Sequence, residues 1–319
     1  MKNEIKYISV DTGKSHTKYA WFEGSVLDVK NIKADSFKSV ISEIAPDELT
    51  RRETLITYDN KTYDVGGNDG RALESSNSKL SNHHKLCTYV AIAKALLRIS
   101  ENNRSTHIID LSINIPLAEF KIKKEEYIQG YKGKVVSIMI NNKKIDFMIG
   151  NVRASYEAAG AAVRNIKDGI NNAHIIDIGG KNDTHISFEN VDDQVKPVKD
   201  KNGMFNNGVL TLLQTIASDL STDFDVTIED VEKIIAGNLS KPENYDRVFD
   251  QRTTSHVAMI KNQVQKYKLN PMFTKLILSG GGSLLLRNQL EIAFSEYKPI
   301  FSSDAQFDNV KGALERVIR

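Results

Sequence analysis

The chain reads YISVDTGKSHTKYAW at residues 7–21 and HIIDIGGKNDTHISF at residues 174–188. In both stretches an apolar run of strand type ends in Asp-x-Gly and leads into a second, alternating segment, which predicts two β-hairpins. The two aspartates are Asp11 and Asp177. A carboxylate beside a glycine turn places a metal-attracting charge next to exposed backbone N–H groups, which can cradle phosphate oxygens. The repeated stretch therefore favours a site for nucleotide phosphates.

Either hairpin alone has a simpler interpretation, an ordinary turn at the end of a strand. Gly13-Lys14-Ser15 also suggests the end of a P-loop. That motif requires a glycine five residues before Gly13, where this chain has Ile8, and a helix directly afterwards, where we expect a strand over 17–21. We therefore reject the P-loop, and the position of both copies after apolar strands favours the paired hairpins.

Composition limits the classes of protein that the chain can belong to. At 319 residues it is long enough for two domains, and its net charge of +2 is too small to indicate nucleic-acid binding. No apolar stretch reaches membrane-spanning length and the first residues lack the apolar segment of a signal peptide, so we expect a cytoplasmic protein without a membrane partner. The single cysteine, Cys87, excludes an intrachain disulfide and a cysteine-based zinc site.

A strand hairpin followed by helices occurs twice along the chain. Around the two hairpins we expect, in chain order, a surface loop rich in Gly, Asn and Ser over 66–81, a helix over 82–99, a buried strand over 108–115, a further hairpin over 135–149, and a strand, glycine turn and helix over 275–294. This repeated order predicts two similar α/β domains with a cleft between them, where ligands bind.

Two further features fit a nucleotide site. Glu157 is the one acid at the start of an alanine-rich helix expected over 156–163, and a carboxylate there can orient a water for attack on a terminal phosphate. The alternative is a glutamate that interacts with the helix dipole. The glycine run over 280–282 either lets a flat ligand approach the backbone or makes a tight connection between strand and helix.

In this order the motifs resemble those of the actin, sugar-kinase and heat-shock-chaperone ATPase superfamily, and within it the ParM/StbA plasmid-segregation actins. The resemblance covers the chain from end to end and rests on Asp11-Thr12-Gly13 with Lys18, Glu157, Asp177-Ile178-Gly179-Gly180, Phe205-Asn206-Asn207-Gly208-Val209, Leu278-Ser279-Gly280-Gly281-Gly282 and Phe307-Asp308-Asn309-Val310-Lys311-Gly312. It implies two actin-like, ribonuclease-H-like domains with a nucleotide cleft between them. Domain I would comprise residues 1–155 plus 305–319, and domain II residues 156–304.

The resemblance also implies ATP or GTP with Mg²⁺ as cofactors. Catalytic roles would fall to Glu157 and Asp177, and Asp11 and Asp177 would bind Mg²⁺ through waters, since magnesium keeps much of its hydration shell. The implied cofactor-binding residues are Asp11, Gly13, Lys14, Ser15, Lys18, Gly179, Gly180, Lys181, Asn182, Gly208, Gly280, Gly281, Gly282 and Ser283.

One departure from the family pattern lies in the second phosphate motif. The family usually continues it with small or hydroxyl residues and an Asp, whereas this chain has Lys181-Asn182-Asp183-Thr184. Two alternatives follow, a rebuilt turn or a different metal shell.

As to function, the resemblance implies an ATPase or GTPase that forms polar filaments of itself. Such filaments segregate plasmid DNA through a DNA-binding adaptor on a centromere-like site, so the chain itself would not contact nucleic acid. Two alternatives remain. One is a small-molecule kinase of the same superfamily, which needs a catalytic Asp beside the acceptor hydroxyl. The other is a nucleotide-binding filament scaffold with weak hydrolysis.

Overall fold

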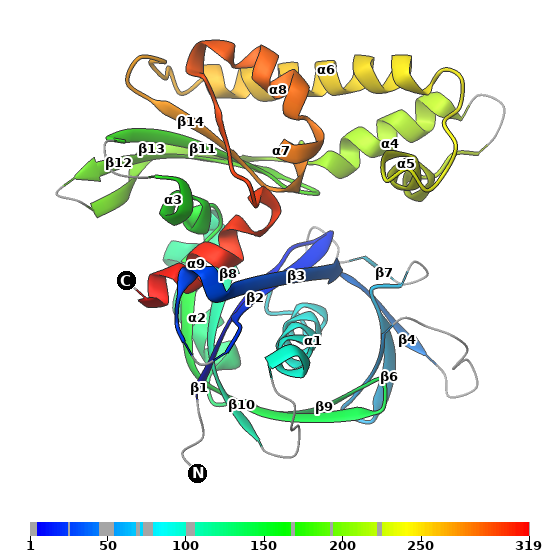
Figure 1. The fold of residues 1–319 in the computed structure, drawn as a ribbon, viewed down its shortest axis with the longest axis vertical. Helices are drawn as coiled ribbons and strands as arrows, with labels where there is room; N and C mark the ends of the chain where they lie inside the picture. The colour runs from blue at the N-terminus through cyan, green and yellow to red at the C-terminus, as the bar shows by residue number, and fades with distance from the viewer. Residues whose placement is uncertain are drawn as a thin grey trace. The chain divides into compact units, whose positions relative to one another are not determined.

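The structure is a computed structural model that describes residues 5–24, 26–44, 54–67, 71–72, 79–99, 106–166, 170–191, 194–221 and 225–318. The chain forms two compact units, residues 1–164 with 307–319 and residues 165–306 (Figure 1). The sequence analysis placed the boundaries between the two domains at 155/156 and at 304/305. Each unit has its own sheet and its own hydrophobic core, so the α/β fold class is confirmed.

In the first unit, ten strands of the described residues form one mixed sheet in the order β3-β2-β1-β8-β10-β9-β5-β6-β4-β7. The strands are β1 (Ile5–Thr12), β2 (His16–Phe22), β3 (Ile32–Lys38), β4 (Val40–Ile44), β5 (Leu55–Tyr58), β6 (Lys61–Val65), β7 (Arg71–Ala72), β8 (His107–Ile115), β9 (Val135–Ile140) and β10 (Lys143–Tyr156). The helices of this unit are α1 (Asn82–Ile99), α2 (Leu117–Tyr131), α3 (Ala159–Asn165) and α9 (Asp308–Ile318).

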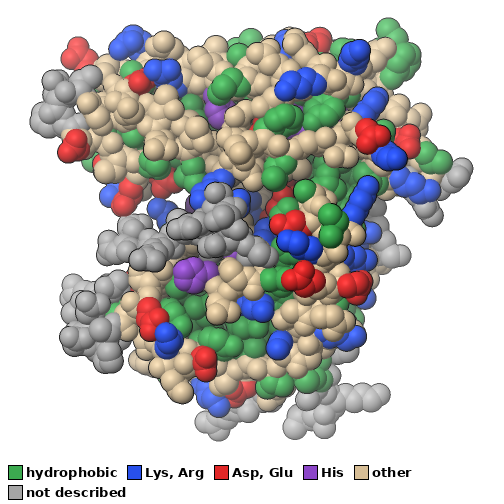
Figure 2. All heavy atoms as spheres, turned by 180° about the vertical axis from the view of Figure 1, so that it is seen from behind, with side chains coloured by type: hydrophobic (Ala, Val, Ile, Leu, Met, Phe, Trp, Pro, Cys, Tyr) green, Lys and Arg blue, Asp and Glu red, His purple; other side chains and the backbone are tan. Residues whose placement is uncertain are grey.

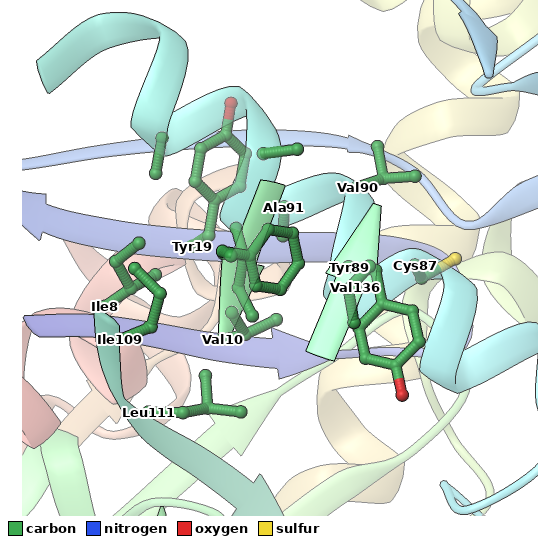
Figure 3. Packing of buried hydrophobic residues seen from close by; sticks show 14 of the residues in the cluster. Ile8, Val10, Tyr19, Cys87, Tyr89, Val90, Ala91, Ile109, Leu111 and Val136 are labelled. Carbon is green, nitrogen blue, oxygen red and sulfur yellow. The ribbon is translucent and has the colours of Figure 1, made fainter. Parts of the chain in front are cut away.

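Strand β2 shows why the central strands of this sheet are rich in apolar residues. Its residues alternate between two buried faces, because Tyr19 and Trp21 belong to the core that contains α1, whereas Ala20 and Phe22 pack with Val310 of α9. Figure 1 shows the sheet of this unit curving around α1, and Figure 3 shows the core that the two elements share. A strand buried on both faces is nearly continuous in apolar residues.

The second unit has a five-stranded sheet among the described residues, in the order β13-β12-β11-β14-β15. Its strands are β11 (Asn172–Ile178), β12 (Asp183–Val191), β13 (Gln194–Phe205), β14 (Lys275–Ser279) and β15 (Ile300–Phe301). Its helices are α4 (Val209–Leu220), α5 (Ile228–Ile235), α6 (Tyr245–Gln265), α7 (Gly281–Leu285) and α8 (Arg287–Ala293). The core joins the apolar faces of β11 and β14 to these helices.

Several local predictions are confirmed and others are corrected. The helix over 82–99 is α1, and the hairpin over 135–149 is β9–β10, whose turn residues Asn141 and Asn142 have positive φ of 47° and 66°. Strand β10 runs on to Tyr156, so α3 begins only at residue 159 and Glu157 lies in the turn before the helix. Of the loop expected over 66–81, residues 68–70 and 73–78 lie outside those described.

The surface carries both signs of charge. On the face drawn in Figure 2, acidic and basic side chains are intermixed, in keeping with the net charge of +2. Among the described residues, no helix combines the length and the apolar character needed to span a membrane.

Candidate functional site

The first Asp-x-Gly stretch forms the turn between β1 and β2. The two strands pair antiparallel with Asp11 opposite Lys18, and Gly13 lies so close to the facing backbone that a Cβ there would be 2.7 Å from the His16 carbonyl oxygen. Ser39 fixes the turn from outside, because its hydroxyl donates to the Gly13 carbonyl (2.7 Å) and its N–H to the Ser15 carbonyl (2.8 Å). Lys14 and Ser15 therefore lie in a turn held by two hydrogen bonds.

The second stretch repeats this construction in the other unit. Strands β11 and β12 pair antiparallel with Asp177 opposite Thr184, seven positions along the chain as in the first hairpin. A Cβ on Gly179 would lie 2.8 Å from the Asn182 carbonyl oxygen, the same close approach across the turn that Gly13 makes. The sequence repeat is thus a repeat of geometry, with an aspartate at the same register position in each hairpin.

The pairing register of β11 and β12 decides where Asp183 and Thr184 lie, the residues in which the second phosphate motif differs from the family pattern. Asp183 pairs with Ile178, the position that corresponds to the buried Thr17 of the first hairpin. Its side chain is fully buried, with Oδ2 3.2 Å from Nε2 of His185. Thr184 is the residue of this motif that faces the same side as Asp177, because directly opposed residues of an antiparallel pair share a face.

Helix α4 begins directly on the second hairpin. The N–H groups of Gly208, Val209 and Leu210 donate to the carbonyls of Lys181 (3.0 Å), Gly179 (3.0 Å) and Gly180 (2.8 Å), respectively. The first N–H groups of a helix have no partner within it, so these bonds satisfy them and fix the turn. The predicted residues Gly179, Gly180, Lys181 and Gly208 therefore form one local structure, with Asn182 completing the turn.

The glycine run after β14 packs against the end of β11 in the same unit. Gly280 has a φ of +80°, and a Cβ there would collide with Asp177 Oδ1 and the Ile178 carbonyl. Its N–H donates to the Ala305 carbonyl (2.9 Å). The expected glycine turn is shorter than the glycine run over 280–282, because α7 already begins at Gly281, with Gly282 packed on Ile178. Ser283 is fully buried and its hydroxyl donates to the Gly280 carbonyl (2.8 Å), a structural contact.

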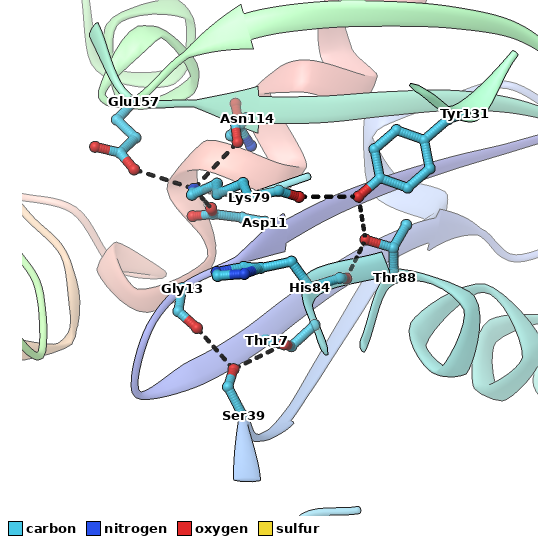
Figure 4. A network of polar contacts seen from close by, with 10 residues as sticks. All are labelled: Asp11, Gly13, Thr17, Ser39, Lys79, His84, Thr88, Asn114, Tyr131 and Glu157. Atoms are coloured by element: carbon cyan, nitrogen blue, oxygen red, sulfur yellow. Dashed lines mark hydrogen bonds and ion pairs between the residues drawn. The ribbon is translucent and has the colours of Figure 1, made fainter. Parts of the chain in front are cut away.

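In the first unit, the predicted Asp11 and Glu157 come together on a residue that the sequence did not indicate. The ammonium of Lys79 lies 3.0 Å from Asp11 Oδ1, 3.0 Å from Glu157 Oε1 and 3.1 Å from the Asn114 carbonyl oxygen (Figure 4). Lys79 stands just before α1 in a stretch rich in polar residues, and no spacing rule links it to strand ends far along the chain. In the sequence, Lys79 is a lone lysine close to the start of the predicted helix, and this was the one signal that could have indicated it.

Opposite charges set the protonation of this cluster. Burial by itself would raise the pKa of Asp11, but attraction to Lys79 and Lys18 holds it below its ordinary value. Burial by itself would lower the pKa of Lys79, and attraction to Asp11 and Glu157 outweighs this and raises it. Asp11 and Lys79 are therefore both charged at neutral pH.

Unsatisfied polar groups border the cluster. The side-chain amide of Asn114 is buried and has no hydrogen-bond partner among the described residues, and the same holds for Nε2 of His84. Figure 4 shows the His84 ring between the Lys79–Asp11 pair and the Gly13 turn. Burial and the nearby Lys79 lower the pKa of His84 to about 3, so the ring is neutral. Buried groups without partners are rare and are typical of places that bind water or a ligand.

The donor set fits magnesium bound mainly through water and phosphate. Within the described residues, no three His, Cys, Asp or Glu side chains are grouped to hold a metal ion. Each unit has one aspartate at the end of its own hairpin, Asp11 in the first unit and Asp177 in the second. Mg²⁺ commonly uses one or two carboxylates together with substrate phosphates, so a full protein cage is not required.

Comparisons with known proteins identify the fold. No family model and no curated protein sequence matches the chain. The structure is similar to a ParM in a 15-stranded filament from Clostridium botulinum (18% identity, TM-score 0.77, 98% of this chain and 99% of that one). It is also similar to the archaeal actin homologue Ta0583 in complex with ADP (17%, 0.76, 98% and 99%) and to the Alp12 filament protein (19%, 0.70, 99% and 98%). The chain therefore has the actin-like fold of the ParM-type proteins.

Proposed function

We propose that the chain is a nucleotide-dependent, filament-forming actin-like ATPase that segregates plasmid DNA through a DNA-binding adaptor. The observation that carries this proposal is the meeting of Asp11 and Glu157 on one buried ammonium. Asp11 stands at the end of the hairpin expected to hold phosphates, and Glu157 is the carboxylate expected to orient water. Two residues far apart in sequence are thus adjacent, which supports the proposal that both serve one phosphate site.

The remaining residues take complementary roles in this proposal. Asp11 and Asp177 would hold waters of Mg²⁺, and Lys18, opposite Asp11, would meet a phosphate oxygen with a charge-assisted hydrogen bond. The Gly280 turn, which only a residue without a Cβ can make against Asp177, would present backbone to the base and sugar. Bound Mg²⁺ would neutralise the phosphate charge that develops during hydrolysis.

Glu157 would act by position. Its backbone N–H donates to the Ile115 carbonyl (3.0 Å) and its Oε1 contacts Lys79, so the residue is held at its backbone and at one carboxylate oxygen. A carboxylate placed in this way can accept a hydrogen bond from a water and align it with the terminal phosphate.

Structural neighbours support assembly and nucleotide binding. Of the three neighbours described above, two were determined as filaments and one with ADP. A head-to-tail contact, in which one patch of a subunit meets a different patch of the next subunit, yields an open filament when its rotation does not close a ring. The adaptor and the plasmid cargo are inferred from the resemblance of the motifs alone.

Sedimentation and light scattering test the proposal directly. Purified protein should pellet and scatter light above a critical concentration when ATP or GTP is added with Mg²⁺, and the signal should decay as phosphate is released. Protein without nucleotide, and protein with nucleotide and excess EDTA, are the controls.

Other outcomes would select the alternatives. A protein that stays monomeric with every nucleotide but releases ADP only when a small-molecule acceptor is added would be a kinase. Stable filaments without phosphate release would indicate a scaffold.

A further inference from the structure

Lys79 occupies a position that the proposed function leaves without a role. Its ammonium has three oxygen neighbours, one from the end of β1, one from the turn before α3 and one from β8. Its side chain is 9% exposed, that of Asp11 9% and that of Glu157 21%. A lysine is almost never buried to this degree unless its charge is paired, so the cluster is a specific arrangement of charges.

The geometry makes the ammonium necessary to the two carboxylates. Both carboxylate oxygens lie 3.0 Å from the same nitrogen, so they are at most 6.0 Å apart. Like charges at this separation in a poorly solvated site repel strongly. Without Lys79 the two side chains would turn apart, take up a proton or attract another cation.

The backbone of Lys79 is anchored separately from its side chain. Its carbonyl accepts a hydrogen bond from the Tyr131 hydroxyl (3.3 Å), which lies 3.2 Å from the Thr88 hydroxyl on α1. Figure 4 shows this chain of contacts running away from the carboxylates. Attachment of this segment to α1 and α2 therefore does not depend on the ammonium, and the ammonium is available for a different task.

We propose that Lys79 is a positioning residue for the hydrolysis assigned to Glu157. It holds the Glu157 carboxylate in its water-orienting position and offsets the charge of Asp11 and Glu157, so that a polyphosphate can enter beside them. This inference rests on the proposed function. It adds that the ammonium, acting through Glu157, sets the rate of the chemical step more than the affinity for nucleotide.

Lys79→Met tests this with a neutral side chain of similar length. Turnover should fall by about 10², as expected when a reacting group is misplaced by about 1 Å, with a smaller change in KM. Lys79→Arg keeps the charge and should restore part of the turnover. Lys61→Met is the matched control, because Lys61 forms an ion pair of the same length (3.0 Å) with Glu43 on the exposed surface of the same unit. It should hydrolyse nucleotide like the parent.

A metal titration without nucleotide gives a readout that does not depend on activity. With the ammonium removed, Asp11 and Glu157 should bind Mn²⁺ alone at least about 10-fold more tightly than in the parent, because two uncompensated carboxylates attract a divalent cation. Electron paramagnetic resonance of free Mn²⁺ measures this. Lys79→Met/Glu157→Gln should lose most of the gain.

A double-mutant cycle separates positioning from a general effect on stability. In a Glu157→Gln background, Lys79→Met should change turnover little, since the group through which it acts is already gone.

Parental turnover and Mn²⁺ affinity in Lys79→Met would overturn the inference while leaving the proposed function standing. If the parent itself binds and hydrolyses no nucleotide, the proposed function fails, and the positioning role with it. Should Lys79→Met not fold, Lys79→Arg decides, because full parental kcat and KM there would contradict a geometric role.

Discussion

Thr184 lies opposite Asp177 across the β11–β12 pair. The corresponding position in the first hairpin is Lys18, opposite Asp11. The two hairpins therefore share their geometry but not their charge, because the first unit adds Lys18 and Lys79 around its aspartate and the second places a hydroxyl there. In the second hairpin the register also separates Asp177, which faces the same side as Thr184, from the fully buried Asp183, and this leads to the first prediction.

Asp177→Ala and Asp183→Ala should affect different properties of the protein, nucleotide binding in the first case and stability in the second. Asp177→Ala is expected to weaken Mg²⁺-dependent nucleotide binding with little loss of stability. Asp183→Ala removes a fully buried carboxylate that lies 3.2 Å from His185, and it should lower the free energy of unfolding by about 1–3 kcal/mol. Urea unfolding and titration with a fluorescent nucleotide measure both. If Asp183→Ala abolished nucleotide binding in a stably folded protein, Asp183 would be the metal-binding residue.

Glu157→Gln should uncouple hydrolysis from binding. The amide keeps the shape of the side chain but cannot act as a base, so phosphate release is expected to slow by about 10² or more. Nucleotide should still bind and filaments should persist longer in light scattering. Unchanged phosphate release would remove Glu157 from the mechanism.

Gly280→Ala should disturb the nucleotide site, whereas Gly237→Ala should only cost stability. Both glycines have similar positive φ, 80° and 75°, where a residue with a Cβ is strained, and the ψ of 159° places Gly280 in a region that essentially only glycine adopts. A Cβ on Gly237 meets nothing within 4 Å, but one on Gly280 collides with Asp177 Oδ1 and the Ile178 carbonyl. Only Gly280→Ala should therefore also weaken nucleotide binding in a fluorescence titration. Equal binding by the two variants would show that this turn does not support the site.

Stability should fall in mild acid because of His174. Burial, with His185 and Lys201 nearby, lowers the pKa of this fully buried histidine to about 3, whereas an unfolded histidine titrates near about 6.5. Between these values the unfolded chain binds the extra proton, so the free energy of unfolding decreases as the pH falls, by about 1.4 kcal/mol per pH unit.

His174→Gln is expected to remove this contribution. Urea unfolding at pH 7 and pH 5 should show a decrease in stability that is smaller by about 2 kcal/mol in the variant. Above pH 7.5 the difference in the free energy of unfolding between the two proteins should be constant, because His174 titrates there in neither the folded nor the unfolded chain. An identical decrease in both proteins would assign the acid sensitivity to other groups.

The sequence by itself determined the local structures that carry the proposed site. Apolar strands that end in Asp-x-Gly specify the hairpins around Asp11 and Asp177, since the alternation fixes the strands and glycine permits the close turn. The Asn141-Asn142 turn and helix α1 follow from equally local rules. Such features depend on neighbours within a few positions, which is the range that a sequence pattern can report.

Only the tertiary structure decided which distant residues meet. Lys79 reaches Asp11 across 68 positions and Asn114 across 35, because β1 and β8 pair in parallel and α1 begins beside their ends. The position of Asp183 depends likewise on the register of β11 and β12, which turns its side chain inward toward His185. Glu157 was expected in a helix, but pairing with β8 extends β10 to Tyr156 and leaves Glu157 in a turn. Sheet pairing and burial are long-range effects, so they override local propensity where the site is assembled.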